Sequence, residues 1–131
     1  MTRSVEELKA FFAMDRFATN NGMYIESIKE GDAICALEIK PELHHNAVGG
    51  VQGGVIFTLA DFAFAAATNC GDKMVVSLKS DISFIRASRG KKLFAHAVER
   101  SSTRKVCFYD VEITDDLGEL IADVSITGYI K

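Results

Sequence analysis

Two features of the chain, eight residues apart, carry groups that could act together on a carbonyl. The first is the glycine-rich segment 49–54, which contains Gly53 and precedes a predicted helix. Backbone amides of a first helical turn lack intrahelical partners and lie at the positive end of the helix dipole, so they can hold an oxyanion. The second is Asp61, which with Thr58 is the only polar residue between 55 and 67. Its carboxylate could attack the carbonyl or activate a water molecule.

Both features also have a purely structural interpretation. Glycines before a helix often serve a tight turn or close packing. Asp61 could be a buried acid satisfied by hydrogen bonds, or a polar contact in a dimer interface. A helix that is apolar on every side must be covered by the rest of the domain or by a second subunit. Because an unpaired ion is costly in an apolar interior, we expect Asp61 to face a cleft.

The spacing between Gly53 and Asp61 predicts a dimer. Eight residues of helix span about 12 Å along the axis, whereas a nucleophile and an oxyanion donor must reach the same reacting group. One chain therefore cannot bring both groups to one substrate. If both are catalytic, Asp61 of one subunit should face Gly53 of an antiparallel second copy, which gives two equivalent sites in a two-fold dimer.

The 131 residues predict one α+β domain, 1–131, in which an antiparallel sheet of about six strands curves around the central helix. Residues 4–18 have apolar side chains at helical spacing, after a capping box formed by Ser4 and Glu7. We expect this N-terminal helix to cover one edge of the core. Alternating patterns predict strands at 23–29, 33–40, 73–86, 91–101, 105–114 and 119–130.

Composition argues against several functional classes. The formal net charge of -3 argues against a nucleic-acid binder. The apolar run in the central helix is shorter than the ~20 residues that a membrane span needs, and it contains an acid. The cysteines and histidines lack metal-ligand spacing, so we expect no metal. Three widely spaced cysteines and the lack of a signal peptide indicate a reduced, cytoplasmic protein.

Basic residues concentrate between positions 86 and 105. This stretch holds seven lysines and arginines and a single acid, Glu99. It either forms two solvated turns or contacts a small polyanion. The candidates for anion contacts are Arg86, Arg89, Arg104 and Lys105.

The segments His45-Asn46, Gly49, Gln52-Gly53-Gly54 and Phe57-Thr58-Leu59-Ala60-Asp61 form a recognisable pattern. Together with the strand from Val76 to Phe84 and the turn Asp116-Leu117-Gly118, this pattern resembles hotdog-fold acyl-CoA thioesterases of the PaaI-like, phenylacetate-pathway group. The resemblance implies a long helix wrapped by an antiparallel sheet, and dimers that often pair into tetramers. It also implies hydrolysis of a coenzyme A thioester without a metal or a bound cofactor, with coenzyme A entering only as part of the substrate.

The resemblance assigns roles to single residues. Asp61 corresponds to the catalytic carboxylate, as general base or nucleophile, and the Gly53 amide to the group that polarises the thioester carbonyl. Asn46 would help to bind this carbonyl, although an asparagine also commonly caps a turn. Ser77 would orient the water molecule, or would simply fill a sheet position. The basic residues named above would contact the coenzyme A phosphates.

Gln52 and Ala87 depart from the family pattern, which usually has His at the first position and often Pro near the second. A glutamine keeps hydrogen-bonding capacity but cannot titrate. We interpret it as a changed subtype of the catalytic site. Because of this departure, the alternative to a thioesterase is a non-catalytic module that binds acyl-CoA or a similar ligand. A hotdog dehydratase is a weaker one, because its chemistry usually needs an Asp and His pair.

Overall fold

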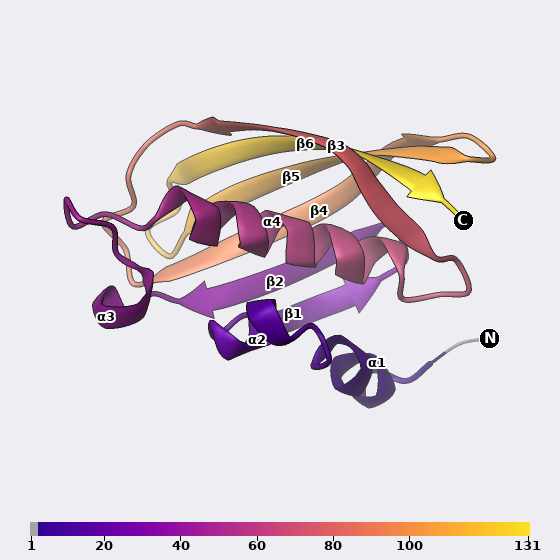
Figure 1. The fold of residues 1–131 in the computed structure, drawn as a ribbon, viewed down its shortest axis with the longest axis horizontal. Helices are drawn as coiled ribbons and strands as arrows, with labels where there is room; N and C mark the ends of the chain where they lie inside the picture. The colour runs from indigo at the N-terminus through magenta and orange to yellow at the C-terminus, as the bar shows by residue number, and fades with distance from the viewer. Residues whose placement is uncertain (1–2) are drawn as a thin grey trace.

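The computed structural model describes residues 3–131, which form one antiparallel sheet wrapped around a long helix (Figure 1). The helices are α1 (Val5–Phe12), α2 (Arg16–Asn20), α3 (Pro41–His44) and α4 (Gly53–Thr68). The strands are β1 (Tyr24–Lys29), β2 (Asp32–Glu38), β3 (Val75–Phe84), β4 (Lys92–Ser102), β5 (Val106–Asp115) and β6 (Leu120–Ile130). The predicted α+β architecture is confirmed.

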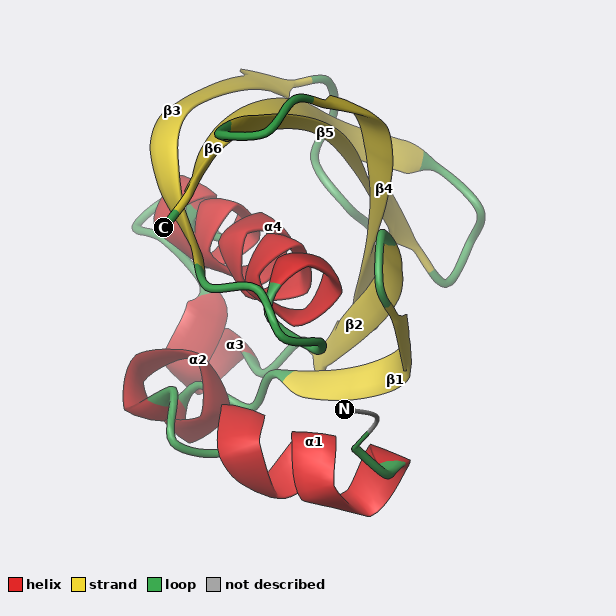
Figure 2. Cartoon of the chain, turned by 90° about the vertical axis from the view of Figure 1, so that its right-hand side faces the viewer, coloured by secondary structure: helices red, strands yellow, loops and turns green. Residues whose placement is uncertain are grey.

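The sheet curves around α4 with the strand order β1-β2-β4-β5-β6-β3, so β1 and β3 are its two edge strands. Figure 2 looks along the roll and shows the strands curving over α4 from β1 to β3. Every neighbouring pair is antiparallel. The six predicted strands are confirmed, because their apolar residues alternate and turn residues such as Gly31, with φ of 82°, separate them.

Helix α4 forms the centre of the core because almost all of its side chains are apolar. Leu59, Ala60 and Ala63 are fully buried against the sheet. Thr58, Asp61 and Ala65 remain only half-buried, and their spacing places them on one helical face. The chain's own sheet therefore leaves one stripe of the helix incompletely covered.

The N-terminal segment forms two helices rather than the single helix predicted for residues 4–18. The Ser4 and Glu7 capping box begins α1 as predicted. The predicted helix is interrupted because the Asp15 side chain accepts a hydrogen bond from the Ala18 amide at 3.2 Å and starts α2 as its N-cap. The Phe12 ring packs edge-on against Phe62 of α4, with centroids 6.4 Å apart. The prediction that this segment covers one edge of the core is confirmed.

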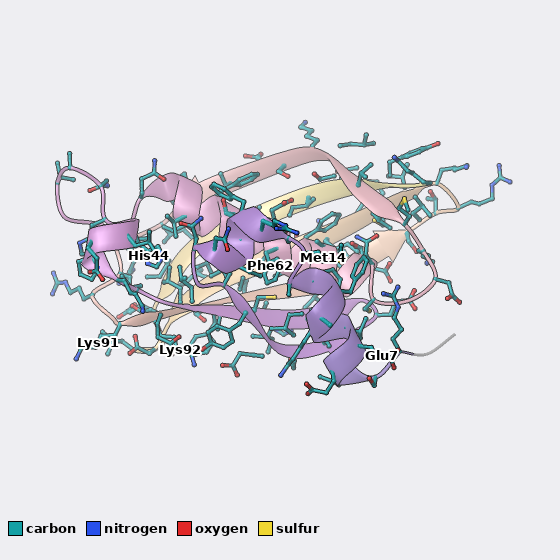
Figure 3. All side chains as sticks on the ribbon, turned by 60° about the horizontal axis from the view of Figure 1, so that its bottom comes forward. Glu7, Met14, His44, Phe62, Lys91 and Lys92 are labelled. Carbon is teal, nitrogen blue, oxygen red and sulfur yellow. The ribbon has the colours of Figure 1, made fainter. Side chains whose placement is uncertain are left out.

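The short helix α3 was not predicted from the sequence. Pro41, expected only to end the first hairpin, occupies the first turn of α3, where a missing amide costs nothing. His44 at its end, labelled in Figure 3, is 1% exposed and accepts a hydrogen bond from the Lys40 amide through Nδ1 at 2.9 Å. Its Nε2 lies 2.8 Å from the carbonyl oxygen of Asn21, to which it donates. This histidine therefore ties the loop before α4 to the end of α2.

Cysteines 35, 70 and 107 are free and buried, as expected for small core groups. Burial raises the pKa of the Cys35 thiol to about 12. Within residues 3–131, no helix has the length and apolar character needed to cross a membrane.

Candidate active site

The start of α4 presents one backbone amide without a partner. The Gln52 carbonyl accepts hydrogen bonds from the amides of Val55 and Ile56 at 2.9 and 3.4 Å. The Gln52 side chain caps the helix, because its Oε1 accepts from the Gly54 amide at 2.6 Å. The amide of Gly53 forms no hydrogen bond with any residue of the described chain. It is therefore the free donor at the positive end of the α4 dipole.

Asn46 holds the loop that leads into α4. Its side-chain Oδ1 accepts hydrogen bonds from the amides of Val48 and Gly50, both at 3.0 Å. Its backbone amide donates to the Gly50 carbonyl at 2.7 Å. Gly49 has φ of 86°, a left-handed conformation that favours glycine. The turn role that we weighed for Asn46 is thus present, and its Nδ2 group is left to donate elsewhere.

Asp61 lies on the half-buried stripe of α4 and has no hydrogen-bond or ion-pair partner among residues 3–131. Burial, and secondarily the negative charge of Asp15, raises the pKa of the Asp61 carboxyl above its ordinary value. A more basic carboxylate is a better general base near neutral pH. Asp61 belongs to the uncovered stripe and lines none of the three cavities that we describe among residues 3–131.

The chain does not bring Asp61 and Gly53 together. Both belong to the continuous helix α4, so about 12 Å of helix axis separates them, as the spacing predicted. Ser77 lies on the exposed edge strand β3 opposite Gly128 of β6. Its hydroxyl has no hydrogen-bond partner in the described part of the chain.

Phe84 closes one side of the helix start, a neighbour that sequence reasoning missed. A Cβ added to Gly53 would lie 3.1 Å from Cζ of the Phe84 ring. Most residues are acceptable at a first helical position, so the glycine there was the only sequence signal that another side chain packs closely against this backbone. The end of β3 and the start of α4 are therefore in contact.

A cavity of about 280 Å³ lies beside the helix start, between α2 and α4. We call it the Phe17 pocket; its lining includes Phe17, Met23, Gln52, Val55 and Phe57. The aromatic and aliphatic side chains give it a mainly apolar wall. Helix α2 thus contributes Phe17 to the surroundings of Gly53, which the amphipathic pattern of the N-terminal segment did not indicate.

The four basic candidates separate into two groups. Arg86 and Arg89 line a groove of about 450 Å³ with Asp115 and Glu119. We call it the Arg86 groove; Arg86 comes two residues after Phe84, whose ring contacts Gly53. Arg86 pairs with Glu119 at 3.0 Å, whereas Arg89 forms no ion pair among the described residues. The other two candidates, Arg104 and Lys105, lie in the β4–β5 turn at the opposite end of the sheet (Figure 1).

Comparison with known proteins identifies the family. Residues 49–122 match the thioesterase superfamily. The chain belongs to this superfamily. It is 37% identical over 106 residues to a putative esterase of Archaeoglobus fulgidus, covering 80% of this chain and 68% of the relative. It is also 31% identical over 114 residues to the acyl-coenzyme A thioesterase PaaI of Escherichia coli, covering 86% and 81%.

A solved structure agrees with this assignment. The structure of the E. coli PaaI protein from the phenylacetic acid degradation operon superposes with a TM-score of 0.84 at 25% identity. The alignment covers 98% of this chain and 96% of PaaI. The resemblance to PaaI-like hotdog thioesterases is confirmed. Within the described part of this thioesterase, no three or more His, Cys, Asp or Glu residues converge as metal ligands would.

Proposed function

We propose that this thioesterase hydrolyses an acyl-CoA to the free acid and coenzyme A at a site shared between two copies of the chain. The observation that carries the proposal is the unpaired Gly53 amide at the start of α4, on the same helix as an unpaired, more basic Asp61. The relationship to PaaI, an acyl-coenzyme A thioesterase, supports the substrate class.

The proposed reaction uses these groups in sequence. The Gly53 amide and the Asn46 Nδ2 donate hydrogen bonds to the thioester carbonyl oxygen and stabilise the negative charge that it acquires. Asp61 of the partner subunit takes a proton from a water molecule as its oxygen attacks the carbonyl carbon. The carbon–sulfur bond then breaks, and the coenzyme A thiolate leaves and is protonated. In the variant of this step, Asp61 attacks the carbonyl carbon itself, the carbon–sulfur bond breaks with loss of the thiolate, and water then hydrolyses the acyl–Asp61 anhydride.

Two surfaces support the shared site. The half-buried stripe of Thr58, Asp61 and Ala65 offers small side chains on α4 for a second helix. The edge strand β3 has unpaired backbone groups on its free side and exposes Leu78 at 61% and Phe84 at 56%. Such an edge is normally protected or paired. Pairing of two β3 strands about a two-fold axis would extend the sheet and set two α4 helices antiparallel.

We place the two ends of the substrate in the Phe17 pocket, beside the start of α4, and in the Arg86 groove, whose first lining residue comes two positions after Phe84. The Arg86 groove would take phosphates of coenzyme A, and Arg89 is the better ligand because it has no carboxylate partner among the described residues. The Phe17 pocket would take the acyl group against its apolar wall. Arg104 and Lys105 lie at the opposite end of the sheet from this groove. They could therefore contact coenzyme A phosphates only at a site of a neighbouring copy.

The Gly53 amide can be tested by removing it while keeping the helix. Proline is tolerated at a first helical position, and Gln52 before it is already extended, with φ of -64° and ψ of 134°. We expect Gly53→Pro to lower kcat by about 10²–10³ relative to Gly53→Ala. The alanine variant keeps the amide and displaces Phe84 in the same way, so it isolates the added Cβ. The measurement is thiol release from a panel of aryl- and fatty-acyl-CoAs.

Two results would count against the proposal. Equal turnover by the proline and alanine variants would remove Gly53 from the reaction. Saturable binding of acyl-CoA without thiol release by the unmodified protein would favour the non-catalytic binding module instead.

A further inference from the structure

A third cavity, of about 260 Å³, lies at the C-terminal end of α4, and we call it the Tyr109 cavity. Its lining includes Glu30, Lys73, Glu99 and Tyr109, from the β1–β2 turn, the α4–β3 loop, β4 and β5. This is the end of the molecule near the C-terminus in Figure 1. The length of α4, about 22 Å, separates the cavity from Gly53, so none of the groups proposed for catalysis belongs to it.

Tyr109 is largely buried, and its hydroxyl forms no hydrogen bond with the described residues. The residue is 3% exposed, and its ring packs edge-on against Phe64 with centroids 5.3 Å apart. Burial, and secondarily Glu99, raises the pKa of Tyr109, which keeps the hydroxyl protonated. Because no buried side-chain oxygen among residues 3–131 lacks a hydrogen bond, this hydroxyl must be accessible from the cavity, where a ligand can bond to it.

The carboxylates beside Tyr109 are held in place by the backbone. The Gly31 amide donates to the Ala67 carbonyl at 3.0 Å, and the Glu99 amide donates to the Gly31 carbonyl at 2.9 Å. These bonds fix the β1–β2 turn, and with it Glu30, against β4 and the end of α4. The backbone of the rim is therefore fixed, and the exposed side chains of Glu30 and Glu99 extend from it.

The charge at this rim favours a cation. Lys73 lies 3.8 Å from Glu30 and offsets its charge. Glu99 forms no ion pair with any described residue, so its carboxylate is uncompensated. The last turn of α4, ending at Thr68, adds the negative end of the helix dipole.

We propose that the Tyr109 cavity binds a small primary amine as its ammonium ion. The ammonium group donates hydrogen bonds to the Glu99 carboxylate and the Tyr109 hydroxyl oxygen, while a short apolar chain packs against Val75 and Cys107. A metal ion fits less well, because among residues 3–131 no three or more His, Cys, Asp or Glu side chains converge.

The probe for this site is n-butylamine, which is protonated at neutral pH. We expect it to shift the NMR signals of the Tyr109 ring in the full chain with a millimolar Kd, while those of Tyr24 and Tyr129 stay in place. The matched probes n-butanol and butyrate lack the positive charge and should leave the Tyr109 signals unchanged. Equal shifts from all three compounds, or none from the amine, would overturn the proposal.

Three variants locate the binding groups. Glu99→Gln and Tyr109→Phe each remove one partner of the ammonium group without changing side-chain size much, and we expect each to weaken n-butylamine binding about tenfold. Glu112→Gln makes the same charge change on an exposed position of β5 and should leave the Kd unchanged. An unchanged Kd in Glu99→Gln and Tyr109→Phe, or an equal loss in all three variants, would contradict the assignment. Acyl-CoA hydrolysis by Glu99→Gln should equal that of the unmodified protein, which separates this site from the proposed active site.

Discussion

Asp61 illustrates how the catalytic role that we propose for it conflicts with folding stability. Its carboxyl is half-buried without a partner in the described chain, and burial raises its pKa above the ordinary value of 3.8. The folded state therefore binds the proton more tightly than the unfolded state does. The resulting contribution to stability is complete below the unfolded pKa and is lost as pH rises through the folded pKa. At neutral pH the charged carboxylate destabilises the fold.

We accordingly expect Asp61→Asn to raise the Tm at pH 7, because the amide removes the buried charge and keeps the shape. The two proteins should converge in Tm below pH 3.8, where the carboxyl is protonated in both the folded and the unfolded state. Thermal unfolding followed by circular dichroism across this pH range measures the difference. A Tm difference that does not change with pH would show that the charge of Asp61 is not its cause.

At the scale of elements, α4 depends on an N-cap that the family resemblance had assigned to catalysis. Gln52 uses its Oε1 for the Gly54 amide, and this leaves only its Nε2 for a substrate. We expect Gln52→Ala to lower the free energy of unfolding by about 1 kcal/mol, because it removes the cap. Gln52→Ser supplies a preferred capping hydroxyl and should recover most of this loss. Urea titrations compare the two variants, and equal losses in both would mean that capping is not what Gln52 contributes.

The elements differ in how far the sequence predicts them. The six strands follow from alternation, and α4 follows from a continuous apolar run, since both patterns report directly which residues a core must bury. The break between α1 and α2 was missed, because apolar spacing continues across Asp15 and the local hydrogen bond of its side chain decides the outcome. Helix α3 was missed because four residues carry too little periodicity.

Much of the candidate site was also predictable, because glycines before a helix and an acid inside an apolar helix are local signals. Gly53, Asn46 and Asp61 lie where their motif placed them, on or before α4. The contact of Phe84 with Gly53 and the proximity of Asp15 to Asp61 were not predictable. Both depend on how distant segments pack, about which local patterns are silent.

For the whole molecule, our proposal requires each chain to supply one half of each of two sites. The uncovered stripe on α4 and the exposed edge β3 are the surfaces that we propose for a two-fold partner. The pairing of dimers into tetramers and a cytoplasmic location stay predictions. Light scattering that finds only monomer at working concentrations would contradict the shared site, since Gly53 and Asp61 of one chain lie too far apart along α4 to act together.

Mixed dimers provide a direct test of the shared site. We expect Asp61→Asn and Gly53→Pro to be nearly inactive alone, and to regain activity when they are unfolded together and refolded as a mixture. A mixed dimer has one site with both defects and one site with neither, because each site takes Asp61 from one subunit and Gly53 from the other. With random pairing, half of the dimers are mixed, so activity should return to about a quarter of the unmodified value. If both groups of a site came from one chain, no site in the mixture would be intact and activity would not return.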